Sequence, residues 1–209
     1  MRTLADLAGH LKLRGARGCE KSRGARGCDL PPLALLTDSA RLADPVPALL
    51  RLPVGSLVVF RHYQAADRSF LAFKLARLCR ERRLALLVAG DFSLAVRLGA
   101  GVHLAEGLAR LAQPRLRLWH RRRRRLLTAA AHGRVALQRA RAIGADAAFL
   151  GSVFPSESHP DGRCLGSLIF RRLTRRAGLP VYALGGVRSS TVGRLRGCGA
   201  AGVATVSGV

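Results

Sequence analysis

The chain has 209 residues, with 36 Lys and Arg against 12 Asp and Glu, and a formal net charge of +24. This length suits one large domain with a well-buried core. No apolar stretch approaches the ~20 residues that a membrane span needs, and the first residues lack the apolar core of a signal peptide. We therefore expect a soluble, cytoplasmic protein with no membrane partner.

Nearly all of the positive charge comes from arginine, because the only lysines are Lys12, Lys21 and Lys74. The arginines are spread along the chain, and aromatic residues make up only 5% of it. A nucleic-acid-binding protein usually gathers its charge on one face and adds aromatic residues or a recognisable module. The composition therefore predicts general attraction to polyanions but no specific nucleic-acid partner.

Residues 1–32 are expected to form an irregular, flexible extension. Within it, residues 14–28 repeat a short Arg- and Gly-rich unit, "RGARGCEKSRGARGC", without hydrophobic periodicity. An RNA-binding arginine–glycine segment is the alternative interpretation. The ordered domain is predicted to begin near Leu33.

From Leu33 onward, short apolar segments alternate with amphipathic, Arg- and Leu-rich stretches. The apolar segments predict strands at 33–38, 56–62, 84–91, 101–106, 126–132, 147–154, 181–187 and 202–208. Helices are predicted at 68–83, 133–145 and 189–200, and in the first of them Phe70, Phe73, Leu75 and Leu78 fall roughly on one face. The run Arg121–Arg125 lies between the fourth and fifth strands, so we expect a solvated connection there.

Eight strands alternating with helices predict a single (β/α)₈ TIM-type barrel over residues 33–209, with an open doubly wound sheet as the alternative. The chain stops just after the eighth strand, so the last helix of such a barrel is expected to be missing. The outer face of the eighth strand could then be covered in two ways: by the N-terminal segment, or by a second copy of the chain in a homodimer.

In a parallel barrel the functional groups gather at the carboxyl ends of the strands. The last two strands end in Gly185–Gly186 and Ser207–Gly208. Small residues let backbone N–H groups approach an anion closely, and this part of a barrel is the usual phosphate site. The pattern predicts a phosphate-binding site, although tight turns alone would also need these glycines.

The segment "LPVYALGGVRSSTVGRLRGCGAAGVATVSGV" (179–209) resembles the C-terminal third of the thiamine-phosphate synthase and thiazole tautomerase family. The resemblance extends back through "GADAAFLGSVFPSESHPDGRCLG" and "GAGVHLAEG" to about residue 33. It implies a (β/α)₈ barrel that binds a small phosphorylated thiazole. The family's thiazole-phosphate residues match Ser156, Ser158, Gly166, Gly185, Gly186, Ser207 and Gly208.

The pyrimidine-pyrophosphate half of the family's site is largely missing. Of its Gln-x-Arg-x-Lys motif only Arg61 is present, and the two expected Mg²⁺ carboxylates fall on Gly90 and Leu108. Mg²⁺ would bind only if Asp91 and Glu106 replaced them. The scattered cysteines also lack the paired spacing of a zinc site, so no metal ligand is assigned. Losing such electrostatic stabilisation costs roughly 10²–10³ in rate per group, which makes full synthase activity unexpected.

The tautomerase branch of the family aromatises the thiazole phosphate without Mg²⁺, and its reaction needs a group that moves a proton. His62, His132 and His159 lie at strand ends and are the candidate catalytic residues, unless they are structural. The leading expectation is a thiamine-biosynthesis enzyme, either a synthase-like transferase or a tautomerase-like isomerase. The alternatives are a non-catalytic phosphate-ligand binder and a basic, nucleic-acid-interacting protein that uses Arg121–Arg125 and the N-terminal extension.

Overall fold

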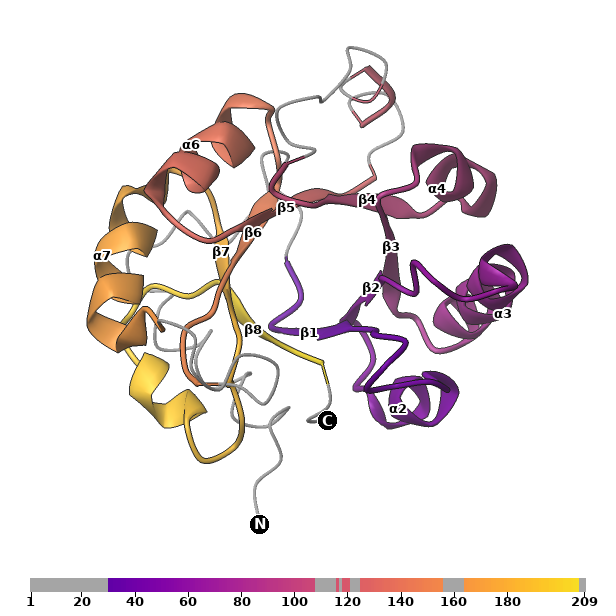
Figure 1. The fold of residues 1–209 in the computed structure, drawn as a ribbon, viewed down its shortest axis with the longest axis horizontal. Coiled ribbons are helices and arrows are strands. Elements are labelled where there is room, and N and C mark those ends of the chain that lie inside the picture. The colour runs from indigo at the N-terminus through magenta and orange to yellow at the C-terminus, as the bar shows by residue number, and fades with distance from the viewer. Residues whose placement is uncertain (1–29, 108–115, 117, 121–124, 156–163, 207–209) are drawn as a thin grey trace.

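The computed structural model describes residues 30–107, 116, 118–120, 125–155 and 164–206. Eight parallel strands form a closed barrel in chain order, as Figure 1 shows. The strands are β1 (Leu33–Leu36), β2 (Leu57–Phe60), β3 (Ala85–Ala89), β4 (Gly101–Leu104), β5 (Leu127–Ala131), β6 (Ala147–Leu150), β7 (Val181–Leu184) and β8 (Gly202–Thr205). Because β8 pairs with β1, the predicted barrel is confirmed and the open sheet is excluded.

Helices surround the barrel: α2 (Val46–Arg51), α3 (Arg68–Glu81), α4 (Phe92–Leu98), α6 (Arg134–Ala142) and α7 (Gly166–Ala177). The helices predicted at 68–83 and 133–145 are confirmed. The stretch predicted at 189–200 contains only the short 3₁₀ helix η3 (Val192–Leu195), since three glycines between residues 193 and 199 disfavour a regular helix. Within the described residues, no helix is long and apolar enough to cross a membrane.

The face that α3 buries differs from the predicted one. Phe70 and Phe73 are 67% and 42% exposed, so the prediction was wrong for both. The residues that α3 buries are Ala72, Leu75, Ala76 and Cys79. This spacing is that of one helical face, and its small side chains let the helix lie close to the strands.

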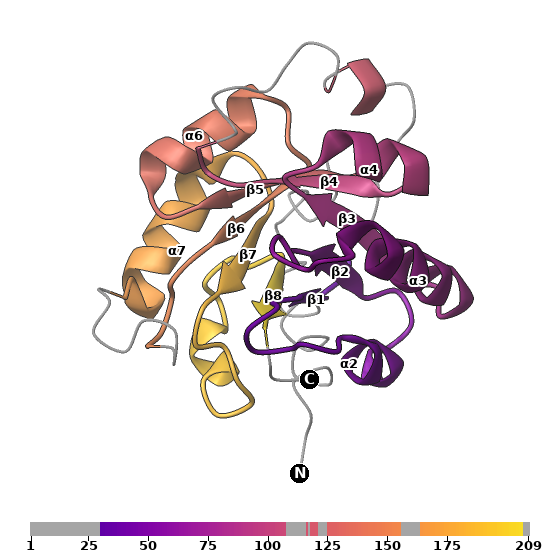
Figure 2. The ribbon, with the colours of Figure 1, turned by 45° about the vertical axis from the view of Figure 1, so that its right-hand side comes forward.

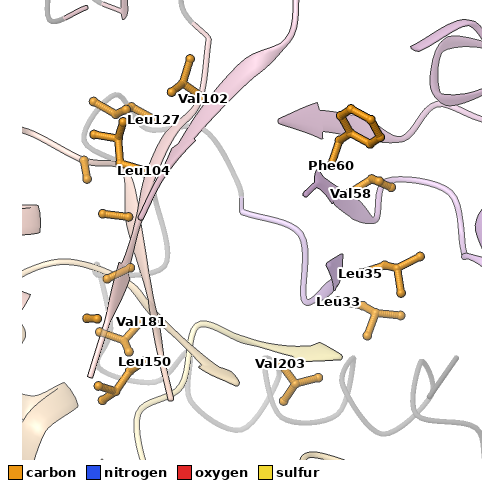
Figure 3. Close-up of a cluster of buried hydrophobic side chains, with 14 of the residues drawn as sticks. Leu33, Leu35, Val58, Phe60, Val102, Leu104, Leu127, Leu150, Val181 and Val203 are labelled. Carbon is orange, nitrogen blue, oxygen red and sulfur yellow. The ribbon is translucent and has the colours of Figure 1, made fainter. Parts of the chain in front are cut away.

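The strands are buried on both sides, which explains their continuous apolar sequences. Side chains that point outward from the strands pack under the helices, as Figure 3 shows for Leu33, Val58 and Leu127 among others. Side chains that point inward fill the barrel, including Leu36, Val59 and Tyr182. The barrel is therefore a packed core, and its chemistry has to lie at one of its ends.

The segment just before β1 packs into the barrel. Leu30 is fully buried and belongs to the interior cluster with Tyr182. The Tyr182 hydroxyl donates a hydrogen bond to the Pro31 carbonyl at 2.5 Å, and the Val203 N–H donates to the Pro32 carbonyl at 2.9 Å. The packed unit therefore includes Leu30, three residues before the boundary expected at Leu33.

The connection that carries the arginine run is fixed where it returns to the barrel. The buried His120 lies 2.7 Å from the Arg125 carbonyl through Nδ1 and 3.6 Å from the Asp146 carboxylate through Nε2. Asp146 also accepts a hydrogen bond from the Leu127 N–H at the start of β5. Arg125 itself is exposed, and Arg121–Arg124 lie outside the described residues.

Candidate functional site

Arg61 lies directly after β2 and is held by the end of β1. Its backbone N–H donates to the Thr37 hydroxyl at 3.0 Å, and its Nε donates to the Thr37 carbonyl at 3.1 Å. Its Nη2 lies 3.3 Å from the Asp38 carboxylate. Burial lowers the pKa of Arg61, and the Asp38 charge opposes this effect. The guanidinium is thus fixed in direction at the carboxyl end of the barrel.

His62 is buried, and both of its ring nitrogens have partners. Nε2 lies 3.1 Å from the Leu42 carbonyl, and Nδ1 lies 2.8 Å from the Thr37 hydroxyl. A carbonyl only accepts, so we place the proton on Nε2 and let Nδ1 accept from the hydroxyl. The ring also stacks on Phe60 at 5.5 Å. With both nitrogens used, His62 is bonded as a structural histidine would be.

Arg68, the first residue of α3, is a site residue that the sequence reasoning missed. Its guanidinium donates to the Asp91 carboxylate at 3.2 Å, to the His62 carbonyl at 3.1 Å and to the Ala89 carbonyl at 2.7 Å. It also lies 5.4 Å from the centre of the Phe60 ring. Figure 2 shows α3 and α4 beside the strands that these contacts connect. The available signal was a charged residue at the start of a predicted helix that directly follows a strand.

The carboxylates that could replace the missing Mg²⁺ ligands are both engaged with other groups. Asp91 caps α4 by accepting a hydrogen bond from the Leu94 N–H at 2.9 Å, and its second oxygen forms an ion pair with Arg68. Glu106 lies 2.6 Å from His132. Among the described residues, no group of three or more His, Cys, Asp and Glu could hold a metal ion. Mg²⁺ needs several oxygen ligands that are free to coordinate it, so these residues do not fit the ion.

His132 follows β5 and forms a pair with Glu106, which follows β4. The Nδ1 atom lies 2.6 Å from the Glu106 carboxylate, and the His132 side chain is 69% exposed. A carboxylate accepts the Nδ1 proton and thereby fixes the tautomer in which Nε2 carries a lone pair. This arrangement can accept a proton at Nε2 and stabilise the imidazolium that forms.

Gly185 and Gly186 pack against the loop that follows β6. Both have left-handed backbone angles, with φ of +90° and +62°. A Cβ at Gly185 would collide with the Ser152 side chain, and one at Gly186 would collide with the carbonyls of Phe154 and Pro155. Neither glycine N–H donates a hydrogen bond to another described residue. Glycine is therefore required sterically, and two backbone donors remain for a ligand.

Gly166 begins α7 beside the same loop. Its N–H donates to the Val153 carbonyl at 2.9 Å, so this donor is already used. The structure thus brings Gly166 and Gly185–Gly186 together around residues 152–155. The remaining predicted site residues, Ser156, Ser158, His159, Ser207 and Gly208, lie outside the described residues.

Comparisons with known proteins identify the family of the chain. Residues 34–209 match the protein family described as Thiamine monophosphate synthase. The chain is 26% identical over 177 residues to the thiamine-phosphate synthase of Bacillus velezensis, which covers 80% of this chain and 77% of that protein. It is 31% identical over 173 residues to the thiamine-phosphate synthase of Methylobacillus flagellatus, which covers 81% of each.

The fold agrees as well. The solved structure of thiamine phosphate pyrophosphorylase from Pyrococcus furiosus superimposes with a TM-score of 0.67 at 23% identity, covering 85% of each chain. At this level of identity the superposition shows the shared barrel, while the sequence match over residues 34–209 shows the family. On that match, the chain belongs to the thiamine monophosphate synthase family.

Proposed function

We propose that this protein takes part in thiamine biosynthesis by binding a thiazole phosphate at the carboxyl end of its barrel and moving a proton on it, as a tautomerase does. The observation that carries the proposal is the His132–Glu106 pair, joined at 2.6 Å with His132 exposed at a strand end. Mg²⁺-dependent displacement of pyrophosphate is disfavoured because the two available carboxylates already have partners. Asp91 is paired with Arg68, and Glu106 is paired with His132.

The phosphate of the ligand is assigned to the loops after β6, β7 and β8. The unused N–H groups of Gly185 and Gly186 are the donors that the described residues offer. The two N–H groups belong to consecutive residues of one loop, and main-chain donors grouped in this way can bind an anion. Ser156, Ser158, Ser207, Gly208 and the α7 start at Gly166 complete the proposed site on the basis of the family resemblance. Arg61, which follows β2 on another part of the rim, corresponds to a pyrophosphate-binding residue of the family and has no part in the proposed proton transfer.

The proposed reaction moves one proton from a ring carbon of the non-aromatic thiazole to an atom outside the ring, so the ring becomes aromatic and no oxidation state changes. Nε2 of His132 takes the proton from a ring carbon, and the C–H electron pair enters the ring π system. The Glu106 carboxylate stabilises the imidazolium until the proton is returned to a second position of the product. His159 stays a candidate for the second proton transfer. His62 is not assigned a role, because both of its nitrogens are hydrogen-bonded.

The experiment follows aromatisation of the non-aromatic thiazole phosphate by ultraviolet absorbance, with Mg²⁺ removed by EDTA. We expect turnover by the wild type, a loss of roughly 10²–10⁴-fold in His132→Gln and a smaller loss in Glu106→Gln. Thermal stabilisation by the product should persist in both variants, since neither side chain is assigned to the phosphate. Binding without turnover in the wild type would identify a non-catalytic ligand binder and overturn the catalytic part of the proposal.

A further inference from the structure

The positive charge is distributed unevenly around the barrel. In the described residues up to 107, six carboxylates accompany the basic side chains. In residues 133–155 and 164–206 there are ten arginines and a single carboxylate, Asp146, which is buried. Arginines that look evenly spread along the sequence therefore produce a strongly basic side of the molecule, because the acidic residues are missing there.

The outer surface of α7 is the most concentrated part of this side. Four arginines and Leu168 line one shallow depression: Arg171, Arg172, Arg175 and Arg176. Their spacing repeats every three to four residues, so they share the face opposite the buried Phe170 and Ala177. All four arginines are exposed, and none forms an ion pair with a described residue.

The neighbouring helix α6 extends the basic surface. Figures 1 and 2 both show α6 and α7 side by side on the barrel. The α6 segment contributes Arg134, Arg139 and Arg141 and contains no acidic residue. The Arg141 guanidinium reaches the end of α7, since a Cβ on Gly178 would lie 2.6 Å from its Nη1 atom. We call the outer faces of these two helices, with their seven arginines, the α6–α7 face.

We propose that the α6–α7 face binds the phosphate backbone of nucleic acid without sequence preference. Guanidinium groups bind phosphate oxygens in a bidentate manner and are weakly hydrated, so several unpaired ones on rigid helices favour a ligand with repeated phosphates. Every Phe and Tyr in the described residues from 125 onward is buried: Phe149, Phe154, Phe170 and Tyr182. Without exposed rings the face offers no base stacking, which leaves the phosphates as its contacts.

An anionic membrane fits this face less well. A helix that lies on a bilayer inserts an apolar face, whereas the apolar face of α7 is buried against the barrel. Among the described residues, the exposed large apolar side chains of the α6–α7 face are Val135, Leu168 and Ile169, at 56%, 80% and 52% exposure, and they form no continuous apolar stripe. Nucleic acid requires only the exposed charges, so it is the favoured partner.

The test compares two variants that remove the same charge from opposite sides of the barrel. The first is Arg172→Gln, Arg175→Gln and Arg176→Gln on α7. The second, the control, is Lys74→Gln, Arg77→Gln and Arg80→Gln on α3, which Figure 1 shows across the barrel from α7. Binding of the full-length proteins to a fluorescent oligouridine is measured by anisotropy over a series of salt concentrations. Circular dichroism checks that both variants are folded.

We expect the slope of log Kobs against log salt to fall in magnitude by about 2 in the α7 variant, because each lost phosphate contact removes about 0.7 for a single strand. The control should change the slope by less than one such contact. Since residues 1–29 and Arg121–Arg125 are unchanged in both variants, their contribution cancels. Equal changes in the two variants would overturn the proposal. So would wild-type binding to phosphatidylglycerol vesicles without binding to oligouridine, which would make the face a membrane contact.

Discussion

Arg68 and Asp91 are joined at 3.2 Å between the start of α3 and the start of α4. The same Asp91 caps α4 through its other oxygen, so one carboxylate connects two helices at the carboxyl end of β2 and β3. In this double role both oxygens of Asp91 already accept a hydrogen bond, and the Arg68 charge beside them opposes the binding of a metal cation. The pair supports the proposal that the reaction of this protein does not use Mg²⁺.

We predict that Asp91→Asn and Asp91→Ala separate the two roles of this side chain. Asparagine keeps the cap and removes the charge, so it should lower the free energy of unfolding by less than about 1 kcal/mol, because the pair is partly exposed. Alanine also removes the cap and should cost about 1 kcal/mol more. Urea unfolding measures both. Equal losses in the two variants would show that the cap contributes nothing.

We predict that thiazole phosphate raises the melting temperature without Mg²⁺. A ligand at ~100 times its Kd adds about 2.7 kcal/mol, enough for a shift of a few degrees in a domain of this size. Mg²⁺ alone should leave the melting temperature unchanged, since Asp91 and Glu106 are engaged. Differential scanning fluorimetry with and without EDTA distinguishes these cases. Stabilisation by a pyrimidine pyrophosphate that strictly requires Mg²⁺ would contradict the proposed function.

Gly186 and Gly166 provide a matched comparison, because their φ angles are +62° and +66°. Alanine at Gly166 meets nothing within 4 Å and should cost only the left-handed backbone strain, about 1–2 kcal/mol. Alanine at Gly186 would in addition lie 2.7 Å from the Phe154 carbonyl oxygen, so its loss of stability should be clearly larger. Thermal unfolding without ligand measures the difference. Similar losses of stability in the two variants would show that the loop after β6 can move away from the new Cβ without a loss of free energy.

Leu30 should behave as a core residue although it precedes the predicted domain. Leu30→Ala removes a fully buried side chain and is expected to lower the free energy of unfolding by about 2–5 kcal/mol. The same substitution at Leu168, which is 80% exposed, serves as the control and should have little effect. Urea unfolding provides the measurement. A Leu30→Ala protein as stable as the control would place the start of the packed unit after residue 30.

We predict that the buried His103 lowers the free energy of unfolding at acidic pH. Burial, with a smaller contribution from Arg61, lowers the pKa of His103 from 6.5 to about 3, so the folded protein keeps it neutral. The unfolded chain binds the extra proton between these values, so stability rises with pH across that window. Lowering the pH through it costs about 1.4 kcal/mol per pH unit from this residue.

The measurement is the free energy of unfolding at pH 7 and pH 5 for the wild type and His103→Gln. The wild type should lose about 2 kcal/mol more than the variant over this interval, because the variant lacks the titrating ring. Carboxylates that titrate near pH 5 are present in both proteins and cancel in the difference. Identical pH dependence in the two proteins would show that His103 is protonated without unfolding.

The sequence alone determined the barrel and the place of its strands. Buried parallel strands need continuous apolar runs, and every predicted run contains one of the observed strands, down to β8. The Gly185–Gly186 pair could also be picked out from the sequence. Only glycine easily adopts a left-handed backbone and also lets another loop approach closely. Features that follow from residue type and short-range spacing could therefore be predicted.

Contacts between distant residues were decided only by the tertiary structure. Arg68 meets Asp91 because the closed barrel places the ends of β2 and β3 side by side, although the two residues are 23 positions apart. The burial of Leu30 depends on Tyr182, from the far end of the chain. The basic α6–α7 face likewise arises because the closed barrel sets two acid-free helices next to each other. Charge, burial and hydrogen-bond partners depend on distances in space, and the fold sets those distances.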